Sequence, residues 1–509
     1  MNHPPMSDED RLEISAAESY RLIADVLAKY ACMDSLIQLK RFIKDLRAQR
    51  RATFTFRGQT MGYHVFPFIA DMIVRHCTTF LVPRARMDEN RFAWLIDKYV
   101  NFPDPLLLPN AAANLDKHVP EWFIRSAFEQ LSRQEGNRSL VPRVLYLYDI
   151  IPKRDPSRHG KFIQTRDQVF GRQFRVSLHD LLLCTSALAA ISSRADLLSD
   201  TLDTDIEWMK DRLQSDAMPI IRSQLTLTRD QYIEKFNVSF DQKYAYIKTT
   251  APVIQWYPIV QFGQGCIVPD PHYLLDRVTR LLDNSFFQFH EDNDILQDYT
   301  GTFGEVFKEY IGQLLKECFG DENVIDLDCI GNLSLRRADW LVLSGRAAAI
   351  VECKSMRYPK LLKKTGDLNI LTAFLDNNLA PALEQLEQTE QQWESIALQV
   401  PLARQVEEFY RFVVVQEHLE FVNRLSDFLT NSDTVRRCWE TNTHIFSVLD
   451  LETAVMSNYA HDFRALFVAQ VTSNPERIAL DTRIRKLPGF QFTGDNFLDR
   501  KLNEYFHRE

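Results

Sequence analysis

Three charged residues stand at the ends of two apolar runs that are separated by a short turn. In ADWLVLSGRAAAIVECKS, residues 338–355, Asp339 precedes the first run, and Glu352 and Lys354 close the second. Charged side chains at the ends of buried strands cost free energy unless they are paired, hydrogen-bonded or bound to a metal ion. The stretch therefore predicts either a structural ion pair or a chemical site.

The alternation of side chains along a strand decides which of these residues can meet. Successive side chains point to opposite faces, so Glu352 and Lys354 share one face and Cys353 lies on the other, where it would pack in the core. A two-residue turn at 344–345 sets Asp339 diagonal to Glu352, and a four-residue turn sets the two acids directly opposite. Any even-numbered turn brings them within roughly 5–8 Å on one face, whereas an odd turn or a bulge would separate them.

Two carboxylates at that distance repel each other when both are ionised, and a divalent cation between them removes the repulsion. Ligation by oxygen atoms alone suits Mg²⁺ or Mn²⁺. Lys354 on the same face could orient a water molecule or stabilise the charge that develops on a phosphoryl group. These are the parts that metal-assisted phosphodiester hydrolysis requires, and a buried Glu352–Lys354 pair with Asp339 capping a turn is the purely structural alternative.

The surrounding sequence predicts the elements that must position the hairpin. Apolar residues recur at helical spacing before and after it, and short apolar runs predict strands. The expected elements are a helix over 303–320, a strand over 323–328, the hairpin, a helix over about 376–398, a buried strand over 411–416, a further helix and a strand over 444–452. This order predicts a mixed α/β sheet with helices packed against it.

With its acid before one strand and Glu-x-Lys at the end of the next, the pattern resembles the PD-(D/E)XK nuclease superfamily. The resemblance covers roughly residues 300–450 and implies a restriction-endonuclease-like αβββαβ core. It also implies that Glu305 on the preceding helix supports the metal site and that Gln385 on the following helix lies near it. Ala338 stands where the first motif of the superfamily has proline. The tripeptides 241–243 and 499–501 also read acid-x-Lys, but neither follows an apolar hairpin.

Basic residues flank the acids on both sides and could bind a phosphate backbone. For any single one of them, a solvent-exposed position in a loop is the alternative. The candidates for nucleic-acid binding, together with Gln385, are Arg336, Arg337, Arg357, Lys360, Lys363 and Lys364.

These observations lead to a hypothesis for function. We expect a metal-dependent endonuclease that uses Mg²⁺ or Mn²⁺ held by Asp339 and Glu352, with DNA favoured over RNA as the substrate. By analogy alone, a restriction or anti-phage defence effector is the expected biological setting. The alternatives are a catalytically inactive nucleic-acid-binding or assembly module of the same fold, and a protein-binding helical scaffold.

The rest of the chain sets the frame for this site. A length of 509 residues predicts two or three domains, and we expect a mainly helical region over 1–290, including helices within 17–50 and 176–198, and the nuclease-like domain over 300–509. The helical region could serve recognition, regulation, homo-oligomerisation or binding of a protein partner.

A net charge of −9 argues against a general polyanion-binding surface, and the eight cysteines form no CxxC pair that would predict a zinc finger. We expect a cytoplasmic protein that does not insert into a membrane.

Overall fold

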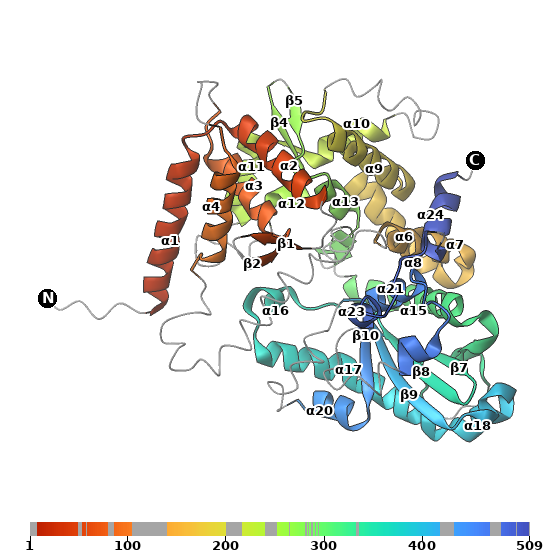
Figure 1. Ribbon diagram of the computed structural model, residues 1–509. Helices are drawn as coiled ribbons and strands as arrows, with labels where there is room; N and C mark the ends of the chain where they lie inside the picture. The colour runs from red at the N-terminus through yellow and green to blue at the C-terminus, as the bar shows by residue number, and fades with distance from the viewer. Residues whose placement is uncertain are drawn as a thin grey trace. The chain divides into compact units, whose positions relative to one another are not determined.

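The computed structural model describes most of the chain and divides it into two compact units (Figure 1). Unit 1 comprises Met1–Trp122, Glu129–Asn137 and Arg166–Phe289, and unit 2 comprises Phe123–Phe128, Arg138–Thr165 and His290–Glu509. The described residues are 8–48, 53–56, 59–79, 86–103, 140–199, 216–239, 252–263, 265–279, 282, 285–286, 289–290, 292–293, 295–331, 335–417, 432–468, 480–494 and 496–507.

Unit 2 therefore contains a segment from the N-terminal half of the chain, which the expected division into 1–290 and 300–509 does not include. Aromatic stacking and a buried ion pair attach this segment to the rest of the unit. The ring of Tyr146 lies 5.5 Å from that of Tyr310 and 5.3 Å from that of Phe497. Arg143 pairs with the buried Glu452. Such long-range contacts carry no signal in the local sequence, so composition alone could not assign this segment.

Unit 2 is built on a five-stranded mixed sheet in the order β10-β9-β8-β7-β6. The pairs β6–β7 and β7–β8 are antiparallel, and β8–β9 and β9–β10 are parallel. The prediction of a mixed α/β sheet, with helices before, within and between its strands, is confirmed. The strands are β6 Val324–Asp326, β7 Trp340–Ser344, β8 Ala347–Lys354, β9 Glu408–Val415 and β10 Thr443–Ser447.

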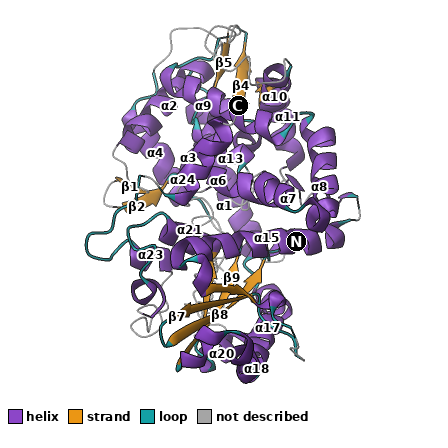
Figure 2. Ribbon diagram, turned by 90° about the vertical axis from the view of Figure 1, so that its right-hand side faces the viewer, coloured by secondary structure: helices purple, strands orange, loops and turns teal. Residues whose placement is uncertain are grey.

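Helices cover both faces of this sheet (Figure 2). The indole of Trp340 packs on α15 and donates a hydrogen bond to the carbonyl of Lys308, so this face of β7 looks toward α15. Lys354 contacts Gln385 of α17 on the other face. The remaining elements of the unit are α6 Leu140–Leu145, η3 Tyr146–Ile150, α7 Ile151–Arg154, α8 Pro156–Val169 (its last turn in unit 1), α15 Leu296–Phe319, η8 Asp321–Asn323, η9 Leu327–Cys329, α16 Lys360–Thr365, α17 Leu368–Gln391, α18 Trp393–Gln399, η10 Pro401–Gln405, α20 Asp433–Glu440, α21 Val448–Val455, η12 Arg464–Val468, α23 Leu480–Ile484 and α24 Phe497–His507.

The hairpin β7–β8 closes with a two-residue turn. Ser344 pairs with Ala347 and Trp340 pairs with Val351, so the turn consists of Gly345 and Arg346. Gly345 has a φ of 59°, which the first turn position of a type II′ hairpin requires and which favours glycine there. The turn is even-numbered but lies one residue later than the 344–345 turn considered above. In this register Trp340 and Val351 form the pair farthest from the turn, and Asp339 and Glu352 are the residues directly beyond that pair.

The prediction of a strand over 444–452 is wrong in its second half. β10 ends at Ser447, and α21 begins directly after it. Ser447 caps this helix, because its hydroxyl accepts a hydrogen bond from the amide of Asp450 while the Asp450 carboxylate accepts one from the amide of Ser447. This reciprocal capping box starts a helix even where the residues that follow are apolar and β-branched.

Glycine at position 312 permits the close approach of α15 to β7. A Cβ atom at Gly312 would overlap the ring of Trp340, which is only 5% exposed. We predict that Gly312→Ala lowers the free energy of unfolding by about 1–3 kcal/mol, the usual cost of overpacking. Gly301→Ala on the same helix is the matched control, because a Cβ atom there would meet no described atom beyond its own helical turn within 4 Å. Chemical denaturation should show a neutral or stabilised control, and an equal loss in both variants would contradict the packing argument.

Unit 1 is mainly helical, as expected, with two small sheets. The helical pattern within 17–50 forms two helices, because the chain breaks at Ala31, which bridges to Thr78. Phe262 pairs with Gly265 in a second hairpin. The elements are α1 Asp8–Leu27, α2 Cys32–Ala48, β1 Thr53–Phe56, β2 Gln59–Gly62, α3 Val65–His76, α4 Glu89–Val100, η4 Phe170–Phe174, α9 Leu178–Arg194, α10 Ala217–Leu225, β3 Thr226–Thr228, α11 Arg229–Ser239, α12 Val253–Trp256, β4 Ile259–Phe262, β5 Gly265–Ile267 and α13 His272–Val278.

A half-buried histidine makes the stability of unit 1 dependent on pH. Burial, together with the charges of Arg75 and Arg229, lowers the pKa of His76 to about 3. Its Nε2 lies 2.7 Å from the hydroxyl of Tyr20. The unfolded chain takes up a proton near pH 6.5 and the folded unit does not, so this stabilisation is complete above pH 6.5 and is lost as the pH falls toward 3.

We therefore predict that unit 1 loses stability by about 1.4 kcal/mol per pH unit below pH 6.5 through this one proton. His76→Gln, which keeps an acceptor for Tyr20, should flatten the dependence of the thermal midpoint on pH. His179→Gln is the control. An unchanged slope in the His76 variant would show that another group controls the acid sensitivity.

Candidate active site

The structure brings the two acids and the lysine of the hairpin together at one end of β7 and β8. Lys354 Nζ lies 2.7 Å from Glu352 Oε1. Asp339 stands just before β7, and its Oδ2 accepts a hydrogen bond of 2.8 Å from the amide of Cys353. The packed sheet of unit 2 thus holds all three side chains.

Glu352 is the least satisfied member of this group. It is only 2% exposed, and its Oε2 atom has no hydrogen-bond partner within the described part of the chain. Burial and the neighbouring charge of Asp339 raise the pKa of Glu352 to about 8. Burial also raises the pKa of Asp339, despite the opposing effects of Lys308 and the Cys353 amide. Within this pair of carboxylates, Glu352 Oε2 is therefore the oxygen atom that lacks a hydrogen-bond donor in the described part of the chain.

A lysine that the sequence interpretation missed reaches the same acids from α15. Lys308 is 5% exposed, and its Nζ lies 3.5 Å from Asp339 Oδ1 and 3.2 Å from Asp326 Oδ1. It also pairs with Asp328. Burial alone would lower the pKa of Lys308, but the hydrogen bond to Asp328 and the charges of these acids raise it. One signal was available in the sequence, because Lys308 directly follows Phe307 inside the apolar stripe of the helix.

Gln385 links the lysine of the hairpin to the loop that carries Asp339. Its Oε1 accepts a hydrogen bond of 3.0 Å from Lys354, and its Nε2 donates one of 3.1 Å to the carbonyl of Arg337. The amide group thus holds Lys354 in place from α17. The structure thus places Gln385 beside Lys354.

Three of the six basic candidates engage protein groups. Arg337 contacts Asp328 and the carbonyl of Ile330. Lys363 pairs with Glu417 at 2.7 Å. Arg357 lies 3.4 Å from the side-chain oxygen of Gln416, and its charge, with that of Lys363, lowers the pKa of Glu417 although burial would raise it.

The other basic candidates differ from these. Arg336 is exposed and has no ion-pair partner among the described residues. Lys360 and Lys364 belong to α16, and their side chains lie outside the described part. Of the basic residues expected to bind nucleic acid, Arg336 is therefore the one that is exposed and makes no ion pair within the described part of the chain.

Glu305, the expected supporting acid, lies one helical turn before Lys308 on α15 and is bound by a base from the N-terminal half. Arg158 of α8 lies 2.5 Å from Glu305 Oε2, and the Glu305 side chain is 53% exposed. His159 pairs in the same way with Glu309 of α15. Glu305 is thus near the site but faces Arg158, so a role as a metal ligand would require this pair to open.

A divalent metal ion can be tested against these residues by their chemistry. Asp339 and Glu352 supply oxygen atoms alone, and the buried, unpartnered Glu352 Oε2 is the donor that a hard cation such as Mg²⁺ or Mn²⁺ would satisfy. In the described residues, no three His, Cys, Asp or Glu side chains gather as a preformed metal site. The donors fit the ion in type, and the two ammonium groups of Lys354 and Lys308 partly take its place.

Comparison with known proteins does not identify the chain. No family model, no curated protein and no solved structure matches it.

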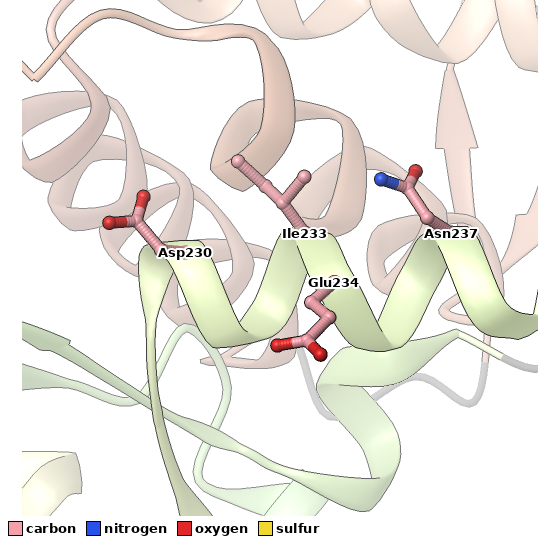
Figure 3. Close-up of a pocket in the computed structure, with 4 residues that line it drawn as sticks. All are labelled: Asp230, Ile233, Glu234 and Asn237. Atoms are coloured by element: carbon pink, nitrogen blue, oxygen red, sulfur yellow. The ribbon is translucent and has the colours of Figure 1, made fainter.

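A hollow of about 460 Å³ lies along α11 in unit 1 (Figure 3). Its lining residues are Asp230, Ile233, Glu234 and Asn237, which share one face of the helix. Among its described lining residues there are two carboxylates and no base, so this wall of the hollow does not suit a phosphate group.

No single helix in the described part is long and apolar enough to cross a membrane. Pro156–Phe174 and Leu178–Arg194, bent by 46° at their junction, reach that length and composition only as a pair.

Proposed function

We propose that unit 2 is a metal-dependent nuclease of the PD-(D/E)XK type that hydrolyses phosphodiester bonds, with DNA as the preferred substrate. The observation that carries the proposal is the convergence of Asp339, Glu352 and Lys354, with Glu352 Oε2 buried and unpartnered. A buried carboxylate oxygen atom without a hydrogen-bond donor costs about 1–3 kcal/mol, and a bound cation is the simplest way to remove this cost. The strand order of the sheet and the hairpin register are compatible with this proposal.

In this proposal each residue has a distinct task. Asp339 and Glu352 would hold a Mg²⁺ or Mn²⁺ ion, which would supply a more acidic water molecule and offset the charge of the phosphate. Lys354 would direct its ammonium group at the attacking water or at the developing negative charge. Gln385 keeps Lys354 in reach of the site from α17. Arg336 contributes a phosphate contact.

The remaining parts of the earlier hypothesis stay within the same proposal. Unit 1 would supply target recognition, regulation, oligomerisation or a surface for a protein partner. A cytoplasmic restriction or anti-phage defence effector is the setting we propose for such an arrangement, by analogy.

One observation favours a second candidate, an inactive nucleic-acid-binding or assembly module of the same fold. Both acids already have an ammonium partner, Lys354 for Glu352 and Lys308 for Asp339, so the site is partly neutralised without metal. DNA affinity distinguishes the candidates. Binding that ignores both Mg²⁺ and the Asp339→Asn change would favour the module.

The proposed activity is tested by incubating the purified full-length protein with supercoiled plasmid in Mg²⁺, Mn²⁺ or EDTA. We expect nicking or linearisation with either metal, none in EDTA, and a loss of about 10²–10⁴-fold in Lys354→Met. Lys501→Met is the matched control, because Lys501 also ends an acid-x-Lys tripeptide but pairs, among the described residues, with Glu504 on α24. Equal cleavage by the Lys354 variant and wild type would refute this assignment of the site.

A further inference from the structure

Lys308 occupies the centre of a cluster of three carboxylates that come from three separate segments. Asp326 ends β6, Asp328 lies in η9, and Asp339 precedes β7. The Lys308 Nζ lies 3.2 Å from Asp326 Oδ1 and 3.5 Å from Asp339 Oδ1, and it also pairs with Asp328. A single buried ammonium group thus compensates three acids, which is the task that a divalent cation performs in an all-oxygen site.

The two acids of the hairpin differ in the hydrogen-bond and ion-pair partners of their carboxylate oxygen atoms. Asp339 Oδ1 faces the ammonium of Lys308, and Asp339 Oδ2 accepts the amide of Cys353. Glu352 Oε1 accepts Lys354, and Glu352 Oε2 is buried without a partner. The oxygen atom that lacks a cation or a donor is therefore Glu352 Oε2, whereas Asp339 Oδ1 already has the ammonium group of Lys308 as its partner.

We infer that Lys308 fills the position of a second metal ion, so that the site accepts one divalent cation per chain and not two. This inference rests on the proposed function, and it makes Lys308 a positioning residue that holds Asp339 for the single ion. Arg337 also contacts this cluster, but in the described part of the chain it reaches Asp328 and backbone carbonyl groups and not Asp339.

The experiment counts the ions that the full-length protein binds. Mn²⁺ is titrated into metal-free protein, and the free ion is measured from its electron paramagnetic resonance signal. We expect one Mn²⁺ per wild-type chain and two per chain of Lys308→Met, in which the alkyl chain is kept and the charge is removed. Arg337→Met is the control and should still bind one ion, since Asp339 keeps its ammonium partner.

Each outcome bears on the inference. Two ions on wild type would overturn it without any variant, which keeps the test valid if Lys308→Met does not fold. One ion on both proteins would overturn it as well. No ion on wild type, whatever Lys308→Met binds, would overturn both the inference and the metal-dependent function proposed above, whereas two ions on wild type would overturn the inference alone. Adding Mn²⁺ should raise the thermal midpoint of Lys308→Met further than that of wild type. The variant would bind one more ion, and an ion that binds only to the folded state stabilises it.

Discussion

Glu352→Gln is expected to abolish cleavage and at the same time to stabilise the protein. The rate of metal-dependent plasmid cleavage should fall by at least about 10³-fold, because the variant loses a charged ligand at the reacting centre. In metal-free buffer at pH 8, the free energy of unfolding should rise by about 1–3 kcal/mol, because a neutral amide avoids the cost of ionising a buried carboxyl group. The expected gain arises because Glu352 is 2% exposed and because burial and the charge of Asp339 raise its pKa to about 8.

A gain of stability upon loss of activity separates a functional acid from a structural one. If Glu352 served only to hold Lys354, its replacement would remove a buried ion pair and destabilise unit 2. Mg²⁺ should raise the thermal midpoint of wild type but not that of the variant. Glu504→Gln, at an exposed acid that pairs with Lys501, is the control and should change neither cleavage nor the response to Mg²⁺. A destabilised Glu352→Gln would argue for the structural ion pair.

Arg143→Ala is expected to destabilise unit 2 by about 3–5 kcal/mol, which is the usual effect of breaking a buried ion pair. The guanidinium donates to both carboxylate oxygens of Glu452 at 2.7 and 2.6 Å, and the hydroxyl of Tyr310 donates to one of them at 2.8 Å. The Glu452 side chain has an exposed fraction of 0%. Among the described residues, removing Arg143 leaves Tyr310 as the remaining hydrogen-bond donor to that buried charge.

The source of this loss can be isolated by replacing the whole group. In a triple variant, Arg143→Met, Glu452→Leu and Tyr310→Phe, no buried polar atom of the cluster remains, so we expect stability within about 1–2 kcal/mol of wild type. Arg436→Ala breaks an exposed pair with Asp433 and should cost less than about 1 kcal/mol. Urea dependence of hydrogen exchange at the amides of β8 measures each variant. A triple variant as unstable as Arg143→Ala would show that shape, and not charge, dominates this contact.

The hairpin was predictable because its information is local. Alternation with period two places Glu352 and Lys354 on one face whatever the rest of the chain does, and an even turn is all that is needed to add Asp339. The helices at 303–320 and about 376–398 and the strand at 411–416 likewise follow from short-range apolar spacing, although the second of these helices divides into α17 and α18. The start of α21 was missed although its signal, the capping box at Ser447, is also local.

By itself, the sequence determined the order of helices and strands in unit 2 and the face on which the acids and Lys354 stand. Only the tertiary structure decided the electrostatics of the site. The contacting residues are far apart in sequence. Lys308 and Asp339 are separated by 31 positions, Lys363 and Glu417 by 54, and Arg158 and Glu305 by 147. A charge is free or neutralised according to what lies within a few ångströms of it, and folding brings those partners from segments whose spacing along the chain carries no periodicity.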